Sequence, residues 1–331
     1  MGKQLTVGKY LGLKQIANEH GLITITAMDH RGSLKRALNP DDPKSVPYEQ
    51  IVAMKRKLAS HLGPHSSALL MDPVYAAAQL IAEKIVPRNC GILVALETTG
   101  YTGSATARLT TILDGWSVEK IKRMGANAVK LLLYYHPDAG DVAPKQEDLV
   151  QFVAEECNKY DIAFLLEPLS YSLDPDIDAK GPEFARMKPD LVIRTADRLT
   201  GLGIDILKAE YPTNPTYTID EKEQYERCKE LDQASKVPWT LLSAGVDYDT
   251  FFHQVRIASQ AGASGFLAGR AIWQEVSKLA PDEQEPFLAT TSVMRLKNIT
   301  NAANAYGRPW FKHSSFDTPI CPVEAGWYQA Y

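Results

Sequence analysis

The sequence lacks the features that mark several classes of protein. Its 331 residues include only four cysteines, and none has the Cys-x-x-Cys spacing of a metal or redox motif. The 36 basic and 40 acidic residues leave a net charge of −4, with no excess of basic residues to bind nucleic acid or anionic lipid. There is no apolar signal-peptide core, and charges interrupt every run long enough to span a bilayer. We therefore expect a cytoplasmic protein without nucleic-acid or membrane partners, with reduced thiols at Cys90, Cys157, Cys228 and Cys321.

Eight short apolar runs recur along the chain, mostly separated by amphipathic segments. Runs without polar alternation are typical of parallel strands that are buried on both faces. Eight alternations of strand and helix favour a (β/α)8 barrel over an open doubly wound sheet. The runs are Leu22–Met28, Ser67–Met71, Ile92–Leu96, Ala128–Leu133, Ile162–Leu166, Ile204–Leu207, Trp239–Leu242 and Gly265–Ala268; the amphipathic segments include Tyr48–Leu62, Ser117–Met124, Gln146–Lys159, Asp220–Ser235 and Thr250–Gln260.

The residues outside this pattern predict additions to the barrel. Val7–Glu19 reads as an N-terminal cap helix, and Glu283–Tyr331 as a C-terminal extension. Because there is no Pro/Ser-rich linker and no low-complexity segment, we expect residues 1–331 to form a single barrel domain.

Three charged residues interrupt the predicted strands: Lys130, Glu167 and Lys208. Burying an unpaired lysine costs several kcal/mol, so one interpretation is that Lys208 pairs with Glu210 or Asp205. The other is an active site. A second ammonium, such as that of Lys130, lowers the pKa of a neighbouring lysine, and the neutral amine attacks carbonyls to form a Schiff base. Glu167 would then move protons, or it merely neutralises a lysine.

In a barrel the carboxyl ends of the strands carry the chemistry. We expect one pocket to collect most of the residues at these ends, which are Asp29, His30, Arg31, Asp72, Glu97, Lys130, Tyr134, Tyr135, Glu167, Lys208, Glu210, Ser243, Ala244, Gly245, Gly269 and Arg270.

Two of these strand ends carry a phosphate-site pattern. Ser243 and Gly245 follow the seventh run, and Gly269 and Arg270 follow the eighth. Loops of this kind expose backbone N–H groups to a phosphate, and an arginine adds a bidentate contact. The alternative is that the glycines only make tight turns.

The loop after the first run and the histidines are considered as binding sites for substrate and for metal. Asp29, His30 and Arg31 bind hydroxyls or a second anion, or form an ion pair within their loop. The Gly63-Pro64 pair breaks the helix that would hold His61 and His65 as metal ligands. We predict no metal and no cofactor.

With these residues in place, the chain resembles the class I tagatose-1,6-bisphosphate aldolase family. The similarity runs from Ile25 to Trp310 and rests on ordered motifs at Ala27–Lys35, Leu70–Tyr75, Thr99–Tyr101, Trp116–Val118, Ala128–Tyr135, Phe164–Glu167, Leu207–Glu210, Leu242–Val246 and Ala268–Ala271. The resemblance implies a metal-independent (β/α)8 enzyme that cleaves a ketose bisphosphate into dihydroxyacetone phosphate and glyceraldehyde 3-phosphate.

The resemblance also implies a role for each matching residue. Lys208 would form the Schiff base, Glu167 would be the acid/base, and Lys130 the supporting lysine. The first phosphate of the ketose would be held by Ser243, Gly245, Gly269 and Arg270, while Asp29 and Arg31 would contact the far end of the sugar.

The chain departs from the family pattern at three positions. His30 replaces a usual glutamine, Thr98 a usual lysine, and Pro168 an aliphatic residue. We expect His30, in a loop away from the phosphate loops, to influence substrate choice and to titrate near pH 6.5.

We interpret the protein as a class I aldolase acting on a phosphorylated ketose, tagatose 1,6-bisphosphate. Related barrels cleave 6-deoxy-6-sulfofructose 1-phosphate, which is the nearest alternative. An alternative of another class is a sugar-phosphate-sensing regulator without turnover. The sequence leaves open whether the protein is a homo-oligomer.

Overall fold

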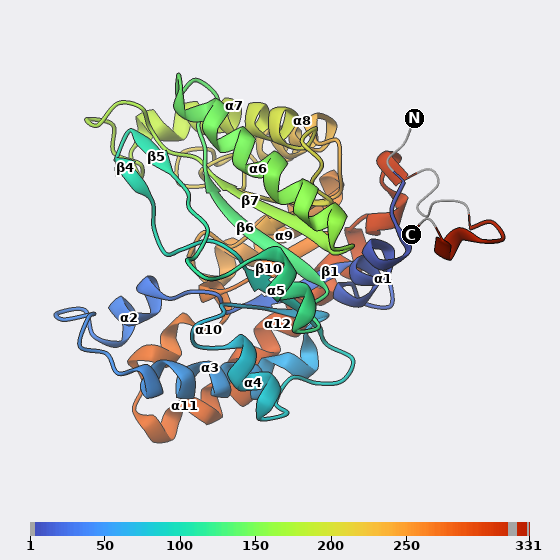
Figure 1. Cartoon of the computed structure of the whole chain (residues 1–331). Coiled ribbons are helices and arrows are strands. Elements are labelled where there is room, and N and C mark those ends of the chain that lie inside the picture. The colour runs from blue at the N-terminus through green and yellow to red at the C-terminus, as the bar shows by residue number, and fades with distance from the viewer. Residues whose placement is uncertain (1–3, 317–322, 330) are drawn as a thin grey trace.

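A closed barrel of eight parallel strands forms the centre of the computed structural model, which describes residues 4–316, 323–329 and 331 (Figure 1). Each strand overlaps one of the apolar runs, so the predicted (β/α)8 barrel is confirmed. The order around the ring is β1-β10-β9-β8-β7-β6-β3-β2. The strands are β1 Ile23–Ala27, β2 Ala68–Met71, β3 Gly91–Ala95, β6 Ala128–Tyr134, β7 Ala163–Leu169, β8 Ile206–Ala209, β9 Trp239–Leu242 and β10 Gly265–Ala268.

Helices between the strands cover the outside of the barrel. Their apolar faces pack on the sheet in one large buried cluster that includes Leu58, Val150, Leu231 and Val255. Among the described residues no helix is long and apolar enough to cross a bilayer. The helices are α2 Gly32–Leu38, α3 Tyr48–Leu62, α4 Ala77–Ala82, α5 Val118–Arg123, α6 Val142–Lys159, α7 Pro182–Leu199, α8 Glu221–Ala234, α9 Tyr248–Ala261, α10 Arg270–Trp273, α11 Pro281–Phe287 and α12 Val293–Tyr306.

The predicted N-terminal cap is helix α1, Val7–Ile16, which lies against the starts of the strands. Its Leu13 and Ile16 join the apolar side chains that fill the lower barrel. Lys9 reaches Asp205 just before β8, with Nζ 3.0 Å from Oδ2, and both side chains are buried. Asp205 is therefore not the partner of Lys208.

The C-terminal segment differs from the predicted extension. Helix α12 packs against α9 and α3, so it closes the ring of helices and belongs to the barrel. Trp310 and Phe316 join the apolar cluster of the lower barrel. Residues 317–322 and 330, including Cys321, lie outside the described residues, whereas Cys90, Cys157 and Cys228 are buried.

A small antiparallel hairpin, which the apolar pattern did not predict, is inserted between β3 and α5. It consists of β4 Thr102–Ser104 and β5 Ala107–Leu109. Gly103 has φ +87°, and a Cβ there would lie 2.2 Å from the carbonyl oxygen of Ala107, so the turn requires glycine. The hairpin stands at the side of the barrel opposite α1 (Figure 1).

Candidate active site

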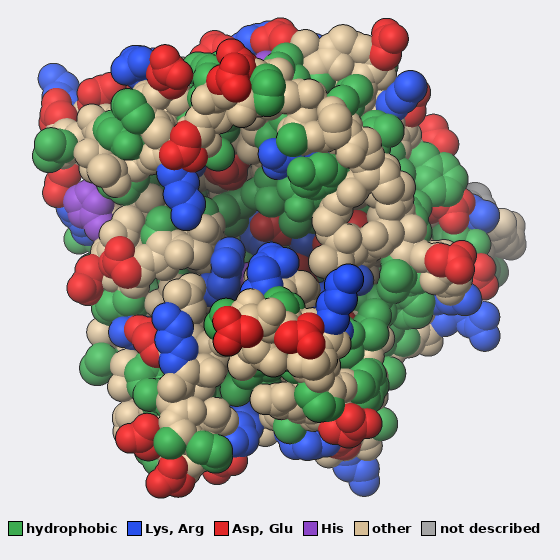
Figure 2. Space-filling model, turned by 90° about the vertical axis from the view of Figure 1, so that its left-hand side faces the viewer, with side chains coloured by type: hydrophobic (Ala, Val, Ile, Leu, Met, Phe, Trp, Pro, Cys, Tyr) green, Lys and Arg blue, Asp and Glu red, His purple; other side chains and the backbone are tan. Residues whose placement is uncertain are grey.

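A cavity of about 510 Å³ opens at the carboxyl ends of the strands. Figure 2 shows lysine and arginine side chains gathered around the hollow. All the residues to which the sequence analysis gave a catalytic or binding role line it: Asp29, His30, Arg31, Lys130, Glu167, Lys208, Ser243, Gly245, Gly269 and Arg270. Asp72 does not, because it forms a fully buried ion pair with Lys55, which also donates to the carbonyl oxygen of Met28.

Strand alternation explains why the charged residues share this cavity. Successive side chains point to opposite faces, so Lys130 faces inward above Ala128, and Glu167 faces inward above Leu165. The strand register pairs Leu166 with Leu207, so the next residues on the two strands, Glu167 and Lys208, stand at one height. Leu132 pairs with Glu167, and Lys130, two residues before Leu132, therefore lies one layer deeper.

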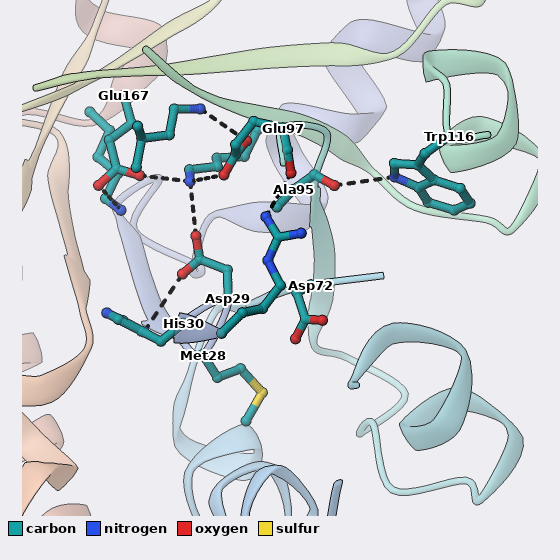
Figure 3. Close-up of polar contacts among 12 residues, drawn as sticks. Met28, Asp29, His30, Asp72, Ala95, Glu97, Trp116 and Glu167 are labelled. Atoms are coloured by element: carbon teal, nitrogen blue, oxygen red, sulfur yellow. Dashed lines mark hydrogen bonds and ion pairs between the residues drawn. The ribbon is translucent and has the colours of Figure 1, made fainter. Parts of the chain in front are cut away.

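Lys130 is surrounded by the carboxylates of Glu97, Asp29 and Glu167, which are labelled in Figure 3. Its Nζ lies 2.6 Å from Glu97 Oε1, 2.9 Å from Asp29 Oδ2 and 3.0 Å from Glu167 Oε2, and its side chain is 1% exposed. Burial by itself would lower the pKa of Lys130, but the three carboxylates outweigh burial and hold the pKa well above its usual value. The three carboxylates therefore favour the ammonium form of Lys130.

Glu167 links the two lysines of the site. Its Oε1 lies 2.6 Å from Lys208 Nζ, while its Oε2 contacts Lys130. Burial would raise the pKa of Glu167, but the two ammonium groups lower it below the usual value. The partner of Lys208 is thus Glu167. Glu210, the other partner considered from the sequence, instead accepts hydrogen bonds from the Ser170 amide and hydroxyl at 2.7 and 2.6 Å.

His30 lies beside the loop that follows β10. Its ring packs edge-on against Trp273, with the centroids 5.4 Å apart, and a Cβ on Gly269 would come within 2.8 Å of its Cε1. The expectation that this loop lies away from the phosphate loops is therefore wrong, because closing the barrel pairs β1 with β10. Burial lowers the pKa of His30 to about 4 although Asp29 Oδ1 is 3.8 Å away. The ring is neutral at pH 7.

Asp29 connects the first loop to the lysine cluster. Burial would raise the pKa of Asp29, but Lys130 and Lys208 outweigh burial, and the pKa lies below its usual value. Arg31 leaves this loop in another direction, and its Nη2 donates to the carbonyl oxygen of Glu97 at 2.6 Å. The loop thus joins the ends of β1 and β3.

The two loops with the phosphate-site pattern meet at the rim of the cavity. Ala244 (φ +48°) and Gly245 (φ +75°) are both left-handed, which turns the backbone sharply after β9. A Cβ on Gly245 would lie 2.9 Å from Arg270 Cζ, so glycine leaves room for the guanidinium group. The Gly269 amide lies 3.4 Å from Ser243 Oγ. The glycines do make tight turns, and those turns admit an arginine.

Four charged residues of the cavity received no catalytic or binding role from the sequence, namely Glu97, Glu210, Arg36 and Arg108, although Glu97 and Glu210 were expected among the strand ends that face the pocket. Glu97 follows β3, and its Oε2 accepts from the Leu132 amide at 3.0 Å; its place at a strand end was a usable signal. Arg36 comes from α2 and Arg108 from the β4–β5 hairpin. Neither lies at the end of a barrel strand, so the apolar pattern gave no signal for them.

No group of three or more His, Cys, Asp or Glu side chains is arranged to hold a metal ion within the described ranges. The expectation of a reaction without a metal stays a prediction.

Comparison with known proteins places the chain in a family. The model of the DeoC/LacD family aldolases matches residues 23–275. The chain belongs to the DeoC/LacD aldolase family. A tagatose 1,6-diphosphate aldolase of Streptococcus agalactiae serotype V is 38% identical over 283 residues, which cover 81% of this chain and 86% of that protein. One from Staphylococcus aureus is 32% identical over 321 residues, which cover 91% and 97%. The protein is accordingly an aldolase, which is a lyase.

Solved structures show the same architecture. The fructose-bisphosphate aldolase of Plasmodium falciparum matches with a TM-score of 0.70 at 13% identity, covering 93% of this chain and 98% of that one. A Schiff base-forming fructose-1,6-bisphosphate aldolase matches with a TM-score of 0.55 at 21% identity, covering 86% and 99%. At these identities the likeness shows the fold that the proteins share.

Proposed function

We propose that this aldolase cleaves tagatose 1,6-bisphosphate into dihydroxyacetone phosphate and glyceraldehyde 3-phosphate through a Schiff base on Lys208. The observation that carries the proposal is the 2.6 Å contact between Lys208 Nζ and the Glu167 carboxylate, which opens onto the cavity. The tagatose 1,6-diphosphate aldolases that cover most of this chain support the substrate.

The contact supplies the proton transfers that imine formation requires. Glu167 accepts a proton from Lys208, and the free amine adds to the ketose carbonyl to give a carbinolamine. Glu167 returns a proton to the departing hydroxyl, which leaves as water. The iminium then accepts the electron pair of the C3–C4 bond as Glu167, again a carboxylate, takes the proton of the C4 hydroxyl, and glyceraldehyde 3-phosphate leaves. Glu167 returns this proton to C3 of the remaining enamine, and water hydrolyses the imine to release dihydroxyacetone phosphate and regenerate Lys208. Lys130, held as an ammonium ion by three carboxylates, stabilises the charged form of Glu167.

The charge of the cavity fits a substrate with two anionic groups. Six cationic side chains and four carboxylates line it, a net of +2, whereas the whole chain carries −4. Ser243, Gly245, Gly269 and Arg270 would hold the phosphate on C1, where small residues leave backbone and guanidinium accessible. Asp29 and Arg31 would contact the sugar beyond the bond that breaks.

Borohydride reduction in the presence of dihydroxyacetone phosphate tests this mechanism. The reduced adduct should add a stable mass to one peptide, the one that contains Lys208. A label on Lys130 would reverse the roles of the two lysines. Absence of any label, with the protein folded and phosphate bound, would rule out the imine.

The sulfofructose phosphate alternative keeps one point in its favour. Two of the departures from the family pattern, His30 and Thr98, line the cavity, and Pro168 does not. Values of kcat/KM for tagatose, fructose and sulfofructose phosphates, measured side by side, decide between the substrates.

The non-catalytic regulator is disfavoured by the intact Lys208, Glu167 and Lys130 cluster. Cytoplasmic location remains a prediction.

A further inference from the structure

Arg108 is a cation of the cavity whose role the proposed mechanism leaves open. Its guanidinium carbon lies 4.7 Å from the ring centre of Tyr101, 4.8 Å from that of Tyr171 and 5.6 Å from that of Tyr134. Within the described part of the chain, its Nε donates to the Ala105 carbonyl at 2.8 Å and the group pairs with no carboxylate. The rest of its donor fork is available to a ligand.

The order of the strands places Arg108 across the mouth from Arg270. Counting around the ring, β6 is the fourth neighbour of β10, and β3 is the fourth neighbour of β9. Because eight strands close the ring, a fourth neighbour stands on the opposite wall. Arg108, over Tyr134 at the end of β6, therefore faces the wall that carries Ser243 and Arg270, and Lys208 on β8 lies between them.

The surroundings of Arg108 hold it in place before any ligand arrives. The faces of tyrosine rings attract a guanidinium group, and three rings limit its rotamers. The hairpin that carries it is narrow, since Gly103 opposite Arg108 has no room for a side chain. A planar fork held in this way suits a tetrahedral oxyanion, which it contacts through two N–H groups.

We propose that Arg108 is the specificity-determining residue for the anionic group on the carbon farthest from the ketose carbonyl. That group is a phosphate or a sulfonate, which present the same oxyanion geometry. The substrate then spans the mouth, with one anion at Arg270 and the other at Arg108. This inference rests on the proposed function and assigns the far end of its substrate.

Arg108→Gln separates the far anion from the rest of the substrate. The measured quantity is kcat/KM for tagatose 1,6-bisphosphate divided by that for tagatose 1-phosphate, which lacks the far anion. The ratio should fall about ten- to a hundredfold, as for the loss of a charge-assisted hydrogen bond, mainly through KM because the anion is remote from the reacting bond. Arg108→Lys should recover part of the loss.

Arg295 offers a matched control outside the cavity. It lies over Tyr248 and Phe287, at 5.1 and 5.7 Å from the ring centres, and pairs with Glu275. Arg295→Gln should leave the ratio unchanged. Repeating the series with 6-deoxy-6-sulfofructose 1-phosphate distinguishes the two anions. A fall in kcat/KM of Arg108→Gln for either substrate supports the site, and the substrate with the larger fall carries the anion that Arg108 binds.

Other outcomes overturn the inference. An unchanged ratio in Arg108→Gln, or equal losses for both tagatose phosphates, would show that Arg108 does not contact the far anion. If that variant does not fold, Tyr101→Ala decides: it loosens the guanidinium group and should lower the same ratio by a smaller factor. Failure of the wild-type protein to trap any imine would instead contradict the proposed function, independently of Arg108.

Discussion

The two ends of the barrel each contain a buried lysine paired with a carboxylate, and strand β8 connects the pairs. At the amino end, Asp205 binds Lys9 beneath α1, and the Phe164 amide also donates to Asp205 Oδ2 at 2.8 Å. At the carboxyl end, Lys208 binds Glu167, which is shared with Lys130 and faces the cavity. The side chains of both pairs are less than 10% exposed.

The difference separates a structural ion pair from the pair that the proposed mechanism uses. Burial and a single short contact are common to both. Only the carboxyl-end pair adds access to a cavity and a carboxylate divided between two ammonium groups. In the proposed mechanism a proton moves from Lys208 to Glu167 beside the substrate, whereas α1 closes off the pair at the other end.

The largest effect is expected from replacing Lys208, the lysine of the carboxyl-end pair. Lys208→Met should abolish imine trapping and reduce kcat by roughly 10⁴-fold or more, because no other amine occupies its position. Far-UV circular dichroism would check that the fold is kept, and mass spectrometry after borohydride treatment would check trapping. A trapped adduct in this variant would mean that another lysine reacts.

The reciprocal change at the amino end should affect stability instead. Lys9→Met removes the buried ammonium group that Asp205 contacts, and breaking a buried ion pair typically costs about 3–5 kcal/mol. Urea denaturation should show the lower free energy of unfolding, while the folded protein still traps an imine at Lys208. Lys9→Met with Asp205→Asn should recover part of the stability. A stable Lys9→Met variant that has lost trapping would erase the contrast between the two ends.

Arg270→Ala should weaken binding of every ketose phosphate alike. Removing a charge-assisted contact worth about 1.5–3 kcal/mol predicts a rise in KM of about ten- to a hundredfold. Dihydroxyacetone, which carries no phosphate, is the control: its trapping should change far less than that of dihydroxyacetone phosphate. If KM stays constant, the phosphate binds elsewhere on the rim.

His30 is expected to give the smallest effect. It tests whether a nearby carboxylate, that of Asp29, is enough to keep an imidazole ring protonated at the carboxyl end of the barrel. Because the folded pKa is about 4, below the usual 6.5, the unfolded chain binds the proton first. The contribution of His30 to stability is thus present above pH 6.5 and is lost as the pH falls toward 4. His30→Gln should remove that part of the pH dependence, measured by urea titration between pH 4 and 7.

Substrate preference provides the second readout for His30→Gln. The ratio of kcat/KM between tagatose bisphosphate and sulfofructose phosphate should shift a few-fold, with no titration near pH 6.5 in either protein. The titration near neutrality expected from the sequence therefore does not apply to the buried ring. A wild-type ratio that changes around pH 6.5 would show that substrate restores the ordinary pKa of His30.

The sequence by itself determined the strands and the inward faces of the barrel. Apolar content and alternation act locally, so runs such as Ala128–Leu133 identified a strand and exposed Lys130 as an anomaly within it. The carboxyl ends of parallel strands meet at one edge, which is why the catalytic and binding residues predicted from the sequence share one cavity.

Only the tertiary structure decided which groups pair. Asp205 finds Lys9, 196 residues away, and Lys208 takes Glu167 in place of the nearby Glu210. Closure of the ring brings His30 against Gly269, and Lys55 draws Asp72 away from the cavity. The hairpin carries Arg108 to the mouth. These contacts depend on strand order, register and loop path, which join distant segments, whereas the periodicity of a strand reports only on its immediate neighbours.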